Sequence, residues 1–165
     1  MALAAACGSR EAVAIDLLER FPQAEIKRPN PEIFTVVDAT LAGVTRRGVQ
    51  PAGPSRLGWK VTVPDRAWLE FAIGMREESW TTQGDGVLFM VGVSDGQHYE
   101  ELMSLVVNPF ANPGDRSWHP LSLDLSVFAG KTVDVIFNTY SSPPERPVDA
   151  NGDLPVWAEP RIVTR

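Results

Sequence analysis

Residues 87–107 read VLFMVGVSDGQHYEELMSLVV, and this stretch decides the class of fold. Valine or phenylalanine occupies every second position from Val87 to Val93, which gives an extended strand one continuous apolar face. Asp95-Gly96 follows, and this pair favours a tight hairpin because both residues tolerate a positive φ. Residues 98–107 then supply a returning strand. The stretch therefore predicts an antiparallel hairpin.

The same period of two recurs along most of the chain. No segment between the predicted strands is suited to a crossover helix, which parallel strands would need. The sequence therefore predicts an all-β fold, an antiparallel β-sandwich of the jelly-roll or Greek-key kind with one short N-terminal helix. The predicted strands span residues 33–39, 41–49, 56–63, 68–74, 87–93, 98–107, 121–125, 133–137 and 154–163.

Proline and glycine punctuate these strands throughout. The chain holds 14 prolines and 13 glycines, which break long helices but suit turns between short strands. The longest loops are predicted at residues 81–86, 108–116 and 141–153, and each is rich in Gly, Pro, Asn or Asp. Because loops on a rigid scaffold commonly carry function, they are the first places to expect a site.

The N-terminal part is predicted to lie outside the sandwich. Ala14, Leu17, Leu18 and Phe21 share a helical spacing that ends at Pro22, which predicts a short helix. We expect residues 1–7 to be the remnant of a signal peptide, 8–31 a linker containing this helix, and 32–165 the β-sandwich domain.

Cys7 is the only cysteine and follows a run of small residues. Residues 1–7 resemble the end of a bacterial lipoprotein signal peptide, in which such a cysteine receives the lipid. Ala4 replaces the usual leucine and a positive n-region is missing, so an ordinary thiol on a tail is the alternative. Lipidation would imply a cell-envelope protein, lipid-anchored or otherwise periplasmic or extracellular.

Length and charge limit the function further. The 165 residues suit one core, and Lys, Arg, Asp and Glu sum to a net charge of −6. An acidic chain without a basic stripe is a poor nucleic-acid binder, because neutralising phosphates dominates that affinity. No apolar run reaches membrane-spanning length, so contact with a membrane is expected only through the lipid on Cys7.

Several segments in the second half carry a family resemblance. Residues 115–119 read DRSWH, residues 123–133 read LDLSVFAGKTV, and residues 137–139 read FNT, ahead of a last strand that carries an aromatic residue. Across residues 59–163 the chain resembles the galactose-binding-like and carbohydrate-binding-module-like jelly rolls of bacterial envelope and secreted proteins. The resemblance implies a non-catalytic domain whose partner is a glycan or an envelope protein.

Aromatic and polar residues near loops and strand ends are the candidates for glycan contact. Sugars present apolar C–H faces that stack on aromatic rings, and hydroxyls that need carboxylates, amides and guanidinium groups. In the alternative interpretation these rings only cap the sandwich, and the domain is structural or binds protein. The candidate ligand-binding residues are Trp80, Asn138, Tyr140, Trp157, Glu159 and Arg161.

Turn aspartates raise the question of a metal. Asp85, Asp115 and Asp153 lie in glycine- and asparagine-rich loops, and their carboxylates would suit a structural calcium ion. No EF-hand spacing is present, and aspartate is also a common turn former. His98 and His119 lack the spacing of a zinc site, so no other cofactor is expected.

Residues 92–96 match G-x-S-x-G, the nucleophile elbow of α/β-hydrolases. Ser94, Asp115 and His119 also occur in the chain order of that family's triad. The elbow requires a strand followed by a helix, whereas strand-like segments flank Ser94 on both sides. The hairpin interpretation is therefore preferred, and a small hydrolase is the third and weakest alternative.

Overall fold

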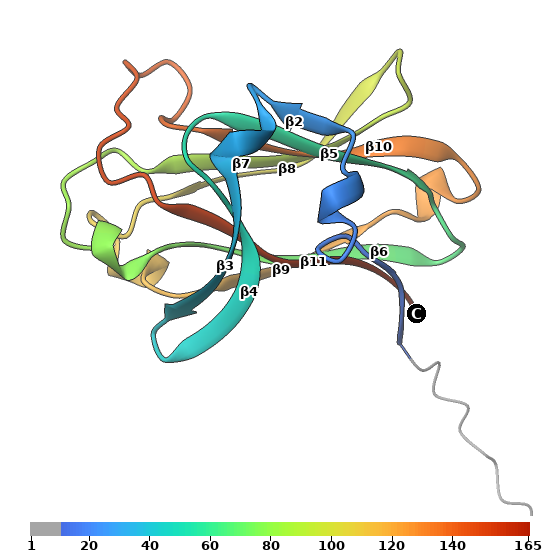
Figure 1. Ribbon diagram of the computed structural model, residues 1–165, viewed down its shortest axis with the longest axis horizontal. Coiled ribbons are helices and arrows are strands. Elements are labelled where there is room, and N and C mark those ends of the chain that lie inside the picture. Colours follow the sequence, from blue (N-terminus) through green and yellow to red (C-terminus); the bar gives the residue numbers. More distant parts are fainter. Residues whose placement is uncertain (1–10) are drawn as a thin grey trace, which may run out of the picture.

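The computed structural model describes residues 11–165, and in it two antiparallel sheets pack face to face (Figure 1). Sheet A has the order β3-β4-β11-β6-β9, with β1 also paired to β11, and sheet B has the order β2-β5-β10-β7-β8. The strands of sheet A are β1 (Ala12–Asp16), β3 (Phe34–Leu41), β4 (Val44–Pro51), β6 (Ala67–Met75), β9 (His119–Asp124) and β11 (Pro155–Thr164). Those of sheet B are β2 (Ile26–Arg28), β5 (Ser55–Thr62), β7 (Val87–Ser94), β8 (Tyr99–Val107) and β10 (Thr132–Tyr140).

The predicted all-β antiparallel sandwich is confirmed. β7 and β8 pair antiparallel, with Val87 opposite Val107 and Ser94 opposite Tyr99, as residues 87–107 predicted. The only helical segments in residues 11–165 are single 3₁₀ turns at Phe21–Gln23, Pro31–Ile33, Glu77–Ser79, Pro113–Asp115 and Ser126–Phe128. Within the same residues, no helix is long and apolar enough to cross a membrane.

The prediction of a short N-terminal helix is wrong. Residues 12–16 form strand β1, which pairs with β11 from Ala12 opposite Thr164 to Asp16 opposite Arg161. Val13 and Ile15 are β-branched and favour a strand, and the edge of β11 gives them backbone partners that a helix could not use. Helical spacing over so few residues was too weak to outweigh this pairing.

The segment predicted to be a linker, residues 8–31, contributes two strands to the sandwich. β1 adds to sheet A, β2 pairs with β5, and the side chain of Leu17 between them is fully buried in the core. The described part of the sandwich therefore begins at Ala12 rather than at residue 32. The first ten residues, which include Cys7, lie outside the described part of the chain.

Four aromatic side chains form the centre of the core between the sheets. Trp157 stacks on Phe137 with centroids 4.5 Å apart, and Phe71 and Phe89 pack against the same indole at 5.8 and 4.9 Å. Inward residues from β6, β7, β10 and β11 thus meet, as alternation in strands dictates. This packing fixes which side chains of β6 and β11 point outward.

The outer face of sheet A carries a second, smaller apolar cluster. Trp118 packs there against Leu41 and Ala72, and its indole N–H donates a 2.8 Å hydrogen bond to the carbonyl of Val44. This bond holds the β3–β4 hairpin against β6 and β9. Figure 1 shows the hairpin extending below the layer that contains β6, β9 and β11.

Candidate functional site

The three long loops meet at one end of the sandwich but close on one another. The Asn108 amide donates to the carbonyl of Gly84 at 3.3 Å, and the Asn151 amide donates to the carbonyl of Gln83. The space left between these loops is about 10 Å³, too small for a sugar ring. The loops therefore do not form the open site that their composition suggested.

Two of the candidate aromatic residues have structural positions. Trp157 is 1% exposed and donates its indole N–H to the hydroxyl of Thr139 at 3.0 Å, so it belongs to the core. Trp80 is partly buried against the cluster around Trp118, and its indole N–H donates to the carbonyl of Met75 at 3.0 Å. The indole of Trp157 is therefore not accessible to a ligand, whereas that of Trp80 is partly exposed. Loop and strand-end positions in sequence do not reveal which face of a strand is covered.

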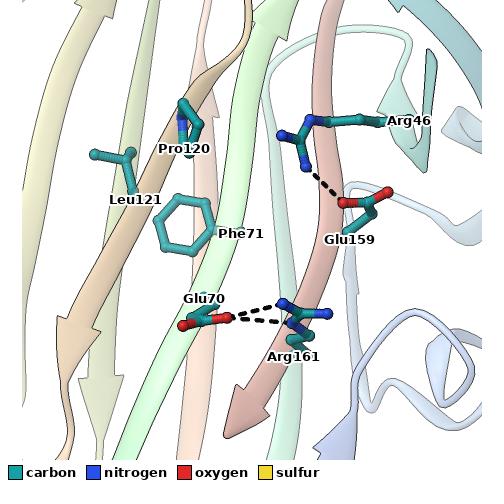
Figure 2. Close-up of a pocket in the computed structure, with 7 residues that line it drawn as sticks. All are labelled: Arg46, Glu70, Phe71, Pro120, Leu121, Glu159 and Arg161. Atoms are coloured by element: carbon teal, nitrogen blue, oxygen red, sulfur yellow. Dashed lines mark hydrogen bonds and ion pairs between the residues drawn. The ribbon is translucent and has the colours of Figure 1, made fainter. Parts of the chain in front are cut away.

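A groove of about 300 Å³ lies on the outer face of sheet A, between the β3–β4 hairpin and β9 (Figure 2). Its charged groups stand on adjacent strands, with Glu159 and Arg161 on β11, Glu70 on β6 and Arg46 on β4. Pro120 and Leu121 of β9 and Phe71 of β6 complete its lining. Two of the six predicted ligand residues, Glu159 and Arg161, thus lie together here.

A bulge in β11 points Glu159 into this groove. Ala158 pairs with Ala72 and Arg161 with Glu70, so Glu159 and Pro160 together face the single residue Phe71. Glu159 has a φ of +48°, in the left-handed region that costs a non-glycine residue about 1–2 kcal/mol. Bulges of this kind often re-aim a side chain beside a functional site.

The bulge also lies where β11 changes its neighbour. β4 pairs with β11 at Trp157 and Ala158, and β1 pairs with it from Arg161 onward. The carbonyl of Pro160 accepts a 3.0 Å hydrogen bond from the Leu17 amide, which anchors this crossing point. The groove therefore opens at the break between two partner strands, where no third strand covers the backbone.

Arg46 and Glu159 form the first ion pair of the groove, with an N–O distance of 2.6 Å. Both side chains are partly exposed, so either could turn polar atoms toward a ligand. The Nε of Arg46 is buried and has no hydrogen-bond partner within residues 11–165. A buried donor left unpaired is costly, and such groups are rare in native structures.

Glu70 forms the second set of ion pairs. Its carboxylate accepts from Arg161 at 3.0 Å and from Arg165 at 2.6 Å. Burial by itself would raise the pKa of Glu70, but the hydrogen bonds from Arg165 and Arg161 outweigh it and hold the pKa below its usual value. Glu70 is therefore ionised at neutral pH, and the groove presents fixed donors and acceptors side by side.

Sequence reasoning missed Arg46 and Glu70. The signal for Glu70 is its place in Ala67–Met75, where it is the single charged residue of an otherwise apolar strand. Arg46 and Arg47 are adjacent and differ only in the face of β4 that they occupy. Arg47 pairs with Asp38 on the hairpin, so its neighbour alone enters the groove.

The two remaining ligand candidates lie on the opposite sheet. Asn138 and Tyr140 are on the outer face of β10, because Phe137 and Thr139, which alternate with them, point into the core. Asn138 is 2% exposed and accepts a 2.8 Å hydrogen bond from Nε of Arg56. The six predicted residues therefore separate into a groove on sheet A, a surface on sheet B and two structural tryptophans.

The three candidate metal ligands are divided as well. Asp115 contacts His119 at 3.1 Å and accepts the Asn108 amide, whereas Asp153 lies near Asp85 and Asp149. Burial, together with these two carboxylates, raises the pKa of Asp153 to about 7, while the hydroxyl of Ser141 offsets part of the increase. Across residues 11–165 no three acidic, histidine or cysteine side chains come together in a way that could hold a metal ion.

Ser94 occupies a hairpin turn, as preferred from the sequence. Its hydroxyl accepts a 3.1 Å hydrogen bond from the Gly96 amide at the end of β7. Asp115 contacts His119 but binds the amide of Asn108, which follows the other end of the β7–β8 hairpin, away from Ser94. A triad of Ser94, Asp115 and His119 is therefore not assembled.

Comparison with solved structures agrees with the fold described above. One match is to a structure of Clostridium perfringens ZmpB. That structure contains the M60 catalytic domain together with the CBM51-1 and CBM51-2 domains. The TM-score is 0.55 at 15% identity, over 78% of this chain and 12% of that one. TmCBM61 in complex with β-1,4-galactotriose matches with a TM-score of 0.53 at 13% identity, over 95% and 90% of the two chains. The fold is that of carbohydrate-binding modules.

A third match is also to a module crystallised with a sugar. The CBM51 of Clostridium perfringens GH95, in complex with methyl-galactose, gives a TM-score of 0.51 at 12% identity, over 79% of this chain and 80% of that one. No protein-family model matches the chain. An uncharacterised protein of Archaeoglobus fulgidus is 36% identical over 104 residues, which span 62% of this chain and 25% of that protein.

Proposed function

We propose that the chain is a non-catalytic module that binds a neutral glycan in the groove on sheet A. The observation that carries the proposal is the strained Glu159, which a bulge turns into the groove beside Arg46. Strain of this kind in a central strand suits a residue kept for binding rather than for stability. The fold shared with carbohydrate-binding modules supports the same role.

The chemistry of the groove favours a hydroxyl-rich ligand. A sugar hydroxyl both donates and accepts, a guanidinium group only donates, and a carboxylate only accepts. The pairs Arg46–Glu159 and Arg161–Glu70 place one of each side by side, so vicinal hydroxyls can bridge them. Each pair is electrically balanced, which favours a neutral sugar over an anionic one.

Binding is tested first with β-1,4-galactan oligosaccharides, because two of the matched modules carry galactose-containing ligands. A wider array of neutral plant, bacterial and host glycans follows, read by retention and then by isothermal titration calorimetry. We expect Arg46→Ala and Glu159→Gln each to weaken binding about tenfold or more. Arg47→Ala is the matched control, because its side chain pairs with Asp38 outside the groove.

Retention of no neutral glycan on the array would overturn the proposal. That result would favour a structural or protein-interaction role for the same sandwich. Equal losses in Arg46→Ala and Arg47→Ala would show that binding does not use the groove.

We also propose that the module belongs to an exported, envelope-associated protein in which Cys7 carries a lipid. The proposal rests on the small residues before Cys7 in the sequence. Mass spectrometry of protein from the membrane fraction tests it. A diacylglyceryl adduct on Cys7 is expected, and an unmodified thiol would contradict it.

A further inference from the structure

The outer face of sheet B carries a second group of polar and aromatic side chains, on the side of the sandwich opposite the groove. Asn138 lies at its centre on β10, with Arg56 on β5 directly opposite. Tyr99 on β8 reaches toward Asn138 from the other side, and Tyr140 follows two residues later on the same face of β10. We name Arg28, Arg56, Tyr99, Asn138 and Tyr140 the tyrosine face.

Hydrogen bonds fix the centre of the tyrosine face. The Asn138 side-chain oxygen accepts from Nε of Arg56 at 2.8 Å, and its amide nitrogen donates to the phenol oxygen of Tyr99 at 3.3 Å. Gly92 lies beneath the Tyr99 ring, where any Cβ would overlap it. The phenol accepts from Asn138, so its own proton stays available for a ligand, and burial raises the pKa of Tyr99.

The two rings are available to a ligand. Tyr99 is 44% exposed and Tyr140 is 40% exposed, although each stands on a regular strand of the sheet. A tyrosine ring offers an apolar face together with a polar tip. Two such rings beside a buried amide and a guanidinium group combine the contacts that the ring and the hydroxyls of a sugar need.

The tyrosine face also concentrates positive charge on an acidic chain. Arg28 of β2 stands directly opposite Arg56 of β5, and like charges in this position destabilise a sheet. Within residues 11–165 neither arginine forms an ion pair, and the terminal nitrogens of Arg56 donate no hydrogen bond. Lys60, four residues further along β5 on the same outer face, pairs instead with Asp134 at 3.3 Å.

The carboxylate of Glu101 also lies near this surface. Glu101 stands opposite Gly92 and close to Tyr99, where it helps to raise the pKa of that phenol. It lies on β8, at the far side of Asn138 from Arg28, because β5, β10 and β7 separate β2 from β8. The end formed by Arg28 and Arg56 therefore stays cationic, which complements an anionic group.

We propose that the tyrosine face binds an acidic saccharide. Arg28 and Arg56 hold its carboxylate or sulfate, Asn138 and the Tyr99 hydroxyl contact its hydroxyls, and Tyr99 and Tyr140 pack on the sugar rings. The site is separate from the groove on sheet A. It takes an anionic ligand, whereas the groove takes a neutral one. One module would thereby hold a neutral and an acidic chain on its two faces.

The experiment measures binding of the full chain to polygalacturonate, to its methyl-esterified form, to a sulfated galactan and to poly-glutamate. Affinity electrophoresis and calorimetry at low and moderate salt supply the readout. We expect polygalacturonate or the sulfated galactan to bind, with weaker binding at higher salt, and the methyl ester to bind about tenfold more weakly than polygalacturonate. Binding of only one of the two acidic polymers identifies the anionic group as carboxylate or sulfate and supports the proposal.

Variants connect that binding to the tyrosine face. Arg28→Ala and Tyr140→Ala each change an exposed side chain and should weaken acidic binding about tenfold, whereas Lys60→Ala should not. Arg46→Ala in the groove should leave acidic binding unchanged, which keeps this proposal distinguishable from the neutral-glycan proposal. Binding of neither acidic polymer, equal binding of poly-glutamate, or full binding by Arg28→Ala would overturn it.

Discussion

The ring of Tyr99 lies across Gly92 on the outer face of sheet B, in the space that any Cβ at position 92 would occupy. From there the phenol reaches Asn138 on β10, the strand on the other side of β7. A glycine in the middle of a strand weakens it, and often marks a close approach. Here the approaching group is the exposed Tyr99. The missing side chain of Gly92 therefore helps to position a candidate ligand contact.

Gly92→Ala should displace this ring without unfolding the protein. The phenol end of Tyr99 is free to swing outward, so we expect loss of the Asn138 hydrogen bond and a stability change of about 0.5–1.5 kcal/mol. Acidic-glycan binding should fall, and the Tyr99 ring resonances should shift in NMR spectra. Gly53→Ala is the control, because nothing lies within 4 Å of a Cβ there. Unchanged Tyr99 resonances in Gly92→Ala would contradict this geometry.

Two substitutions of Glu159 separate strain from binding. Glu159→Ala and Glu159→Gly both remove the carboxylate and should both lose neutral-glycan binding. Only glycine adopts a φ of +48° freely, so we expect Glu159→Gly to be more stable than Glu159→Ala by about 1 kcal/mol in urea unfolding. Losing the partly exposed ion pair with Arg46 costs both variants about 0–1 kcal/mol. Equal stability of the two variants would show that position 159 carries no backbone strain.

Asp153→Asn should change how stability depends on pH. The pKa of Asp153 is about 7 in the folded chain and near 3.8 in an unfolded one, so the folded state binds the proton more tightly. The free energy of unfolding that this group contributes is then highest below about pH 4, falls as the pH rises to 7, and stays low above it. The melting temperature of Asp153→Asn minus that of the unaltered chain should therefore grow between pH 4 and pH 7.

Calcium chloride supplies the control for that experiment. A bound cation would favour the ionised carboxylate and cancel its cost. If calcium at pH 8 raises the melting temperature of the unaltered chain but not of Asp153→Asn, the loop binds a cation and the expected pH dependence holds only for metal-free protein. A constant melting-temperature difference from pH 4 to pH 8 would instead show that Asp153 has an ordinary pKa.

Leu17→Ala tests whether the N-terminal segment is part of the sandwich. Leu17 is fully buried in the core, so truncation should lower the free energy of unfolding by about 2–5 kcal/mol. Leu18→Ala is the matched control, since that neighbour is only partly buried and should cost less. Indistinguishable unfolding of the two variants in urea would show that the segment behaves as a linker.

The sequence by itself determined the class of fold and nine of the eleven strands in residues 11–165. Alternation from Val87 to Val93 and the Asp-Gly turn after it are local signals, because strand period and turn conformation depend on neighbouring residues. β1 and β2 escaped prediction for the converse reason. Each is short, and what makes it a strand is a partner far away in sequence, β11 for one and β5 for the other.

Only the tertiary structure decided where the candidate sites lie. Glu159 and Arg161 were recognisable as sugar-binding residue types, but Arg46 and Glu70 join them through pairings across 113 and 91 residues. Trp157 looked equally suitable in the sequence and proved to be the centre of the core. The chemistry of each residue can be read directly from the sequence. The face of the sheet that a residue occupies depends instead on strand register and on the bulge at Glu159, and both are set by strands distant in the chain.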